Sequence, residues 1–334
     1  MDSRGKAVYE SLNFPGFESI VVKNIVFSHN LFLRGELENK NLKIDNELSV
    51  INRTREEEAT SFLAGFVRPA LRTTTLPGTF FLHKYKSEKK AFEAEDRVRT
   101  FLTAVKIFKN SWCSSNFSFS IGPRNKFYRP FNLTGRVDEI FFSQKNTTLS
   151  SMTEFNKIKK IHQRLYSAGF ENHLHYSKLC NATVFFNRSY EEAWTLMKTT
   201  LAFTAIESLF SDSSKSEVTY KVALRTATFL YPKDFLKRRE VFNFIKRGYD
   251  IRSYFVHGSD VQKRVETLMK KFAEEKGEAY DFHRNFIQDL EGIVAECLKK
   301  ILLDEKLFAF FSNEKISPAE ESEFYEKLSL GAAL

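Results

Sequence analysis

Residues 279–303 read AYDFHRNFIQDLEGIVAECLKKILL, and their apolar side chains follow the period of a helix. One continuous stripe recurs every three or four positions: Phe286, Leu290, Ile293, Cys297 and Ile301. A stripe with this period is typical of an amphipathic helix that packs one face against a core. The stretch therefore predicts a long helix whose apolar face is buried.

The helical period extends back to about Ser150, in a region where Gly is scarce and Pro nearly absent. Further helices are predicted over 152–168, 173–187, 190–210, 216–230 and 234–256. We therefore expect an all-helical domain over 149–310, followed by a C-terminal tail or helix over 311–334.

The first part of the chain, residues 1–148, has a different pattern. Short alternating or β-branched runs predict strands at 20–29, 46–54, 78–85 and 116–122. Between them, residues 91–110 predict a helix through Val98, Phe101, Leu102, Val105 and Phe108. The predicted class is α+β, with a mixed α/β domain over 1–148 that precedes the helical bundle. The polar segment 144–152 lies at the boundary.

Composition places the chain among ordinary globular proteins. Of its 334 residues, 28% are charged and 42% are hydrophobic, which argues against disorder. It contains neither a run of ~18 apolar residues nor an N-terminal signal-peptide pattern, so we expect a soluble, cytoplasmic protein with no membrane span. The 51 Lys and Arg against 42 Asp and Glu leave a net charge of +9, which favours acidic partners such as nucleic acid.

Motifs for metals, nucleotides and ester hydrolysis are missing from the sequence. Cys113, Cys180 and Cys297 are far apart and predict free thiols. His173 and His175 would point apart on a helix, and no acidic or Cys partner lies at ligand spacing. The chain has no Gly-rich phosphate loop, G-x-S-x-G or H-E-x-x-H motif. We therefore expect no metal site and no cofactor.

A candidate reactive motif lies at 249–258, which read YDIRSYFVHG. Four residues separate Arg252 from His257. On a straight α-helix, five positions correspond to a rotation of about 140° and a rise of about 7.5 Å, so the two side chains do not share a face. Their convergence would require a kink, a helix end or a second subunit.

Together with two earlier segments, this motif resembles the HEPN domains, in particular the ApeA-like HEPN group of prokaryotic defence proteins. The resemblance rests on an ordered set: AIESLF at 205–210 with Glu207, KVALRTATFLY at 221–231 with Arg225, and Arg252-x4-His257 ending in Val-His-Gly. It covers about residues 160–305 and implies a HEPN-like helical bundle.

The resemblance implies a metal-independent endoribonuclease that acts as a homodimer, with Arg252 and His257 of both subunits in one composite site. Such an enzyme would cleave cellular or phage RNA, for example transfer RNA, in antiphage defence or as a toxin. Histidine can move the protons of the 2′-OH and the leaving 5′ oxygen, and arginine can stabilise charge on phosphorus. The products would be 2′,3′-cyclic phosphates, and DNA would be spared. The N-terminal domain would sense a phage or cellular trigger.

Four residues are candidates for supporting this site: Ser253, Glu207, Asp250 and Arg225. Ser253 follows the Arg where the family usually has a polar residue, often Asn, Asp or His, so its orienting role is weaker here. Glu207 lies in an apolar helix and needs a cationic partner, for which Arg252 and Arg225 are equally good candidates. Asp250 either holds Arg252 or faces solvent.

Basic residues near this motif form a predicted RNA contact: Lys237, Arg238, Arg239, Lys246 and Arg247. A solvated helix face is the alternative interpretation of this run. The segment GPRNKFYR at 122–129 is likewise either a basic turn between strands or a single-strand binding loop. For the whole chain, the competing hypothesis is a non-catalytic HEPN-like module that binds RNA, a nucleotide or a partner protein.

Overall fold

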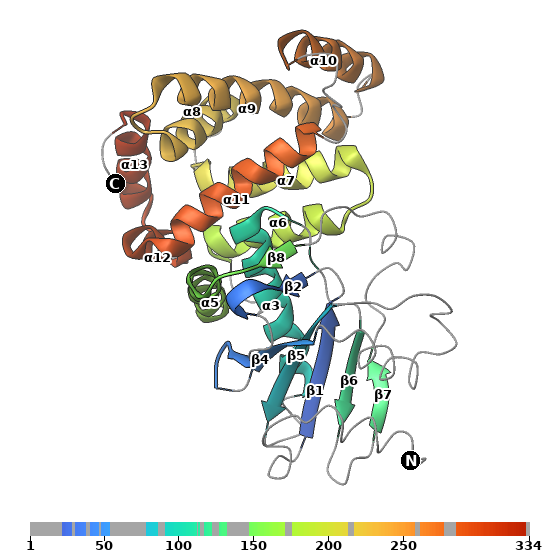
Figure 1. The fold of residues 1–334 in the computed structure, drawn as a ribbon. Coiled ribbons are helices and arrows are strands. Elements are labelled where there is room, and N and C mark those ends of the chain that lie inside the picture. Colours follow the sequence, from blue (N-terminus) through green and yellow to red (C-terminus); the bar gives the residue numbers. More distant parts are fainter. Residues whose placement is uncertain are drawn as a thin grey trace. The chain divides into compact units, whose positions relative to one another are not determined.

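The computed structural model describes residues 22–28, 31–37, 41–46, 48–53, 78–85, 91–111, 113, 117–121, 127–131, 147–170, 176–212, 217–257, 261–276 and 285–331. The chain forms two compact units, Met1–His162 and Gln163–Leu334. The first contains a sheet and the second is helical, so the predicted α+β class is confirmed at this level (Figure 1).

An antiparallel sheet of six strands forms the first unit, in the order β3-β4-β5-β1-β6-β7. Its strands are β1 Val22–Ser28, β3 Asn41–Lys43, β4 Leu48–Arg53, β5 Gly78–Tyr85, β6 Phe117–Ile121 and β7 Phe127–Phe131. All four predicted strands are therefore confirmed. Four of the described strands were not predicted. They are β3 and β7 of this sheet, and β2 Leu31–Leu33 and β8 Thr147–Leu149, which pair in parallel. A 3₁₀ turn, η1 Gly35–Leu37, follows β2.

The predicted helix at 91–110 is also confirmed, as α3 Ala91–Lys109. Its buried Phe101 packs 6.2 Å, between ring centroids, from Phe155 of helix α5 Met152–Ser167. The predicted boundary between the domains lay before α5, at 148/149, whereas the two compact units divide inside this helix. Phe155 and the other buried residues at the start of α5 explain why that part belongs to the first unit.

Helices make up the described part of the second unit, as predicted. They are α6 Lys178–Glu191, α7 Thr195–Phe210, α8 Val218–Leu230, α9 Phe235–Val256, α10 Val261–Lys276, α11 Ile287–Leu303, α12 Glu305–Ser312 and α13 Pro318–Ser329. The sequence did not predict α10, and α13 occupies the predicted C-terminal tail or helix.

Two predicted helix starts were wrong, and a side-chain cap explains the first of them. Helix α6 begins at Lys178 because the Ser177 hydroxyl accepts the Cys180 N–H at 3.2 Å. Helix α7 begins at Thr195 without a side-chain N-cap; before it, the Glu192 carboxylate accepts the backbone N–H groups of Ala193 and Trp194, at 2.9 and 3.0 Å, in the turn that separates α6 from α7. The predicted start of α11, residue 279, lies outside the described residues.

Aromatic and aliphatic side chains fill the helical core. The predicted stripe on α11 is buried at Leu290, Cys297 and Ile301, and Ile293 is half-buried. Gly248 of α9 lies where a Cβ would be 2.6 Å from a ring carbon of Phe203 and 2.7 Å from one of Phe286. Only glycine therefore fits without rearrangement, and α9 approaches α7 closely at this point.

The three cysteines are free thiols, as predicted, and all are buried. Burial raises the pKa of Cys113 to about 12 and also raises the pKa of Cys180 and Cys297, so these thiols stay protonated at neutral pH. Within the described ranges, no helix is long and apolar enough to span a membrane.

Candidate functional site

Helix α9 carries both residues of the Arg-x4-His motif. Asp234 caps its start by accepting the Lys237 N–H at 3.1 Å, and the His257 N–H donates to the Ser253 carbonyl at its end. The helix is continuous between these caps. Arg252 and His257 therefore lie about 140° apart around its axis, on different faces.

Glu207 of α7 binds Arg252. The Arg252 Nη2 donates to Glu207 Oε2 at 3.1 Å, and the Tyr249 hydroxyl donates to the other carboxylate oxygen. The Arg252 Nη1 in turn donates to the Tyr249 hydroxyl at 3.4 Å. Of the two partners that the sequence left open for Glu207, the structure has Arg252. We call Glu207, Tyr249 and Arg252 the arginine cluster.

Tyr249 is the member of the arginine cluster that the sequence interpretation missed. It precedes Arg252 by three positions, so both side chains lie on the same side of α9, and this spacing is the signal that could have found it. Burial, and the hydrogen bond and charge of Glu207, raise the pKa of Tyr249. The phenol therefore keeps its proton and remains a donor to the carboxylate.

The guanidinium of Arg252 is well held but incompletely satisfied. Its side chain is 23% exposed and that of Glu207 is 16% exposed. The Arg252 Nε is buried and has no hydrogen-bond partner among the described residues. An arginine and a carboxylate bind most strongly through two parallel hydrogen bonds, and Arg252 makes only one to Glu207. A buried donor without a partner, such as the Arg252 Nε, costs about 1–3 kcal/mol of stability. The Nε of Arg225 is likewise buried and has no partner in the described part of the chain, so this feature alone does not distinguish a functional arginine from a structural one.

His257 lies on a different surface, an exposed stripe along α9. The stripe contains Arg239, Asn243, Lys246, Asp250, Ser253 and His257, which recur every three or four positions. From Arg239 to His257 is five helical turns, or about 27 Å, so the first and last members point the same way. Ser253 is half-buried and the other members are exposed. Asp250 therefore lies on the stripe and faces away from Arg252.

The predicted RNA-binding residues separate into two groups. Lys237 pairs with Asp234 at 3.7 Å, and Arg238 and Arg247 lie over the rings of Phe235 and Phe272. Two other residues lie on the exposed stripe and form no ion pair with any described residue: Arg239 and Lys246. These two cations are available to an anionic ligand that extends along the stripe, since on α9 Lys246 lies about 16.5 Å and Arg239 about 27 Å from His257.

Arg225 has a structural role instead of supporting Arg252. It donates to Asp212 at 2.6 Å and to the Phe210 carbonyl at 2.9 Å, and its side chain is 7% exposed. Its guanidinium carbon lies 4.3 Å from the ring centroid of Tyr325, whose hydroxyl donates to the Leu209 carbonyl. Arg225 thus ties the end of α7 to α8 and to α13.

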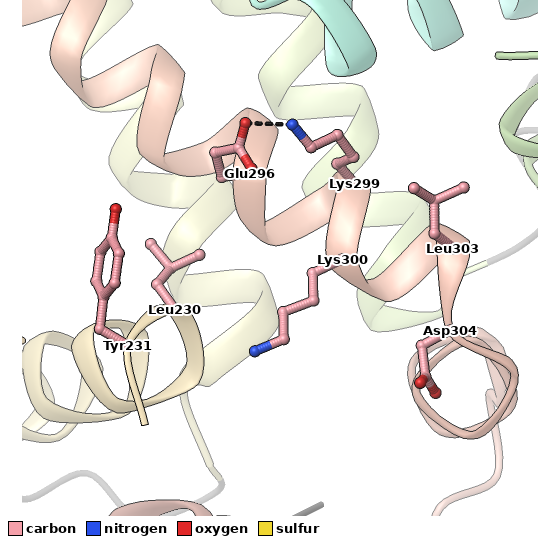
Figure 2. Close-up of a pocket in the computed structure, with 7 residues that line it drawn as sticks. All are labelled: Leu230, Tyr231, Glu296, Lys299, Lys300, Leu303 and Asp304. Atoms are coloured by element: carbon pink, nitrogen blue, oxygen red, sulfur yellow. Dashed lines mark hydrogen bonds and ion pairs between the residues drawn. The ribbon is translucent and has the colours of Figure 1, made fainter. Parts of the chain in front are cut away.

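A separate open pocket of about 550 Å³ lies between the end of α8 and α11 (Figure 2). Lys300 points toward α8, where its Nζ donates to the Phe229 carbonyl at 2.5 Å and lies 4.8 Å from the Phe229 ring centroid. Burial lowers the pKa of Lys300. Its hydrogen bond satisfies a carbonyl in the last turn of α8, which is a helix-capping role. None of the predicted site residues lines this pocket.

In the part of the chain that the structure describes, no group of three His, Cys, Asp or Glu side chains could hold a metal ion. Two of the features weighed in the sequence cannot be placed. His173 and His175 lie outside the described residues, and so does 122–126, the first part of the basic segment. Residues 127–129 of that segment belong to β7.

The chain matches no protein-family model, no curated protein and no solved structure. The side chains of the site therefore carry the functional interpretation alone.

Proposed function

We propose that this chain is a metal-independent, HEPN-type endoribonuclease that acts in the cytoplasm as a homodimer. The observation that carries the proposal is the presence of two residues near the end of α9: an exposed His257, and an Arg252 that Glu207 and Tyr249 hold in place. The first residue type moves protons and the second stabilises anionic phosphate, and RNA cleavage by internal attack needs both.

In the proposed reaction, His257 takes the proton of a ribose 2′-OH. The freed oxygen attacks the adjacent phosphorus, the bond from phosphorus to the 5′ oxygen breaks, and that oxygen receives a proton from the protonated imidazole of His257 in one of the two subunits. Arg252 stabilises the negative charge that builds on the phosphate oxygens. Because Glu207 and Tyr249 already restrict the guanidinium, little reorganisation is required when this charge develops.

The geometry of α9 supports the dimer in this proposal. Within one chain, about 140° of rotation and about 7.5 Å of rise separate the positions of Arg252 and His257, and His257 is the C-cap of the helix. A composite site that takes the two residues from different subunits does not require this separation to be bridged within one chain. Isologous contact of two copies of α9 would supply it.

Incubation of the purified chain with total cellular RNA in EDTA tests the proposed activity. We expect cleavage that leaves 2′,3′-cyclic phosphate and 5′-hydroxyl ends, while DNA and 2′-O-methylated RNA stay intact because they offer no free 2′-OH. A parallel preparation of the His257→Ala variant controls for co-purifying ribonucleases. Cleavage that EDTA abolishes, or products with 3′-hydroxyl ends, would contradict the proposal.

One observation favours the competing function, a helical module that binds RNA without cutting it. The carboxylate of Glu207 lies 3.1 Å from the guanidinium of Arg252 and offsets part of the charge that would act on a phosphate. In the same assay such a module would bind RNA and leave it intact. Retention of RNA without any His257-dependent cleavage would establish it.

Replacing Tyr249 with phenylalanine is expected to lower the single-turnover cleavage rate about two- to tenfold, less than the full contribution of its charge-assisted hydrogen bonds, because Tyr249 acts on the phosphate only through Arg252. The substitution keeps the edge contact with Phe203, at 5.8 Å between ring centroids, and removes only the hydroxyl that links Glu207 to Arg252. The maximal rate should fall while the RNA concentration at half-maximal rate stays constant. Tyr220→Phe, on exposed α8 surface, is the matched control. An unchanged rate would exclude Tyr249 as a positioning residue.

A further inference from the structure

An exposed aromatic surface lies beside His257. Trp194 immediately precedes α7, is 57% exposed, and meets the ring of Phe255 edge-on at 5.1 Å between centroids. Phe255 is in the last turn of α9, two residues before His257, and Val256 between them is 51% exposed. We call these three residues, Trp194, Phe255 and Val256, the Trp194 surface.

The position of Trp194 is well defined although its side chain is exposed. Its backbone N–H donates to the Glu192 carboxylate at 3.0 Å, and its backbone carbonyl accepts the Lys198 N–H at 2.9 Å. Contact with Phe255 further restricts the indole. An aromatic ring with few conformations to lose binds a flat ligand at low entropic cost.

Cations lie next to this surface on α7 and further away along the exposed stripe of α9. Lys198 lies one turn along α7 from Trp194 and is half-buried, and Glu192, the acidic residue next to Trp194, is already occupied by the two backbone donors. On α9, Lys246 and Arg239 lie on the same exposed stripe as His257, about 16.5 and 27 Å further along the helix, and the exposed carboxylate of Asp250 lies between Lys246 and His257. The combination of an exposed ring and aligned free cations suits a ligand that has both aromatic faces and phosphates.

We propose that the Trp194 surface stacks an unpaired base of the RNA next to the scissile phosphate, while the phosphates on one side of it follow the exposed stripe. The proposal rests on the proposed function and specifies its substrate class as single-stranded RNA or an RNA loop. A duplex does not fit this role, because its bases are stacked within the helix and cannot lie against a protein ring.

The test measures RNA binding in the His257→Ala background, so that the RNA stays intact. Trp194→Ala is expected to weaken binding of a labelled single-stranded RNA about five- to a hundredfold at fixed salt, the range for one stacked base. Binding of the same RNA in a duplex should change less than about twofold. The matched control is Tyr220→Ala, because Tyr220 is 50% exposed and contacts Phe242 edge-on at 5.5 Å.

A second arm identifies stacking itself. An abasic nucleotide moved along the single strand should weaken binding most at one position, and this loss should vanish in Trp194→Ala, because the two changes remove the same contact. Single-stranded binding that Trp194→Ala leaves unchanged, an equal loss for single strand and duplex, or no RNA binding at all would each overturn the proposal. If the wild type sediments as a dimer and Trp194→Ala sediments as a monomer, the proposal is also overturned, because the Trp194 surface would then be a subunit contact.

Failure of this inference and failure of the proposed function give different results. His257-dependent cleavage with normal rates in Trp194→Ala would refute the stacking site and leave the ribonuclease standing. Trp194-dependent binding of single strands by a wild-type chain that cuts no RNA would support the stacking site and refute the ribonuclease.

Discussion

Replacing His257 with alanine is expected to slow RNA cleavage by about 10²–10⁴-fold, the usual contribution of a general acid or base. The side chain is exposed at the end of α9 and donates no side-chain hydrogen bond to any described residue, so its loss should leave the stability of the fold unchanged. Single-turnover rates with a defined RNA, together with urea unfolding of both proteins, measure the two effects. A loss of less than threefold in a folded variant would contradict the assigned role.

Coexpression of His257→Ala with Arg252→Ala extends this prediction to the composite site. Each homodimer should be inactive, whereas the mixed dimer combines an intact Arg252 from one subunit with an intact His257 from the other. Partial recovery of cleavage is therefore expected in the mixed dimer. Inactivity of a mixed dimer whose assembly has been verified would show that each active site takes both residues from one chain.

Replacing Asp212 with alanine is expected to destabilise the helical unit by about 3–5 kcal/mol, because the charge of Arg225 would remain buried after its carboxylate partner is removed. Arg225 is 7% exposed on its side chain and Asp212 is 18% exposed, so solvent compensates little. The free energy of unfolding from urea titration measures the loss. Asp212→Asn keeps a hydrogen-bond acceptor and should lose less.

The exposed pair between Lys327 and Glu323 on α13 is the matched control for this measurement. Its side chains are 57% and 65% exposed, and ion pairs in water contribute little to stability. Glu323→Ala should therefore leave the unfolding midpoint almost unchanged. Equal and small effects of Asp212→Ala and Glu323→Ala would contradict the structural role of Arg225.

Much of this fold could be predicted because its apolar residues repeat with the periods of strands and helices. The helix at 91–110 and the strand at 78–85 are examples, since their patterns are local. Helix starts were less predictable. The cap at Ser177 and the turn at Glu192 depend on individual side-chain hydrogen bonds, and no Pro or Gly marks the junction between α6 and α7. Helix α10 could have been predicted, because Val261, Val265, Leu268 and Phe272 recur at helical spacing among its many charged residues.

The sequence identified most residues of the candidate site, but it could not show which of them contact one another. Glu207, Arg225 and Arg252 all stood out in the sequence, yet the partner of Glu207 depends on how α7, α8 and α9 are rotated against one another. That rotation is a property of the packed core. The exposed stripe follows from helical spacing, but only the structure separates Arg239 and Lys246 from the neighbouring cations that are paired or stacked.

Because Gly248 has no side chain, α9 packs closely against α7, and this close packing sets the distance between Arg252 and Glu207. Arg252 lies one turn further along α9, and its partner Glu207 lies one turn beyond Phe203 on α7. A methyl group at 248 would push the two helices apart at the point that sets the reach between guanidinium and carboxylate. Position 248 is thus a spacer, and genetic screens for lost activity should recover substitutions there although the residue touches no substrate.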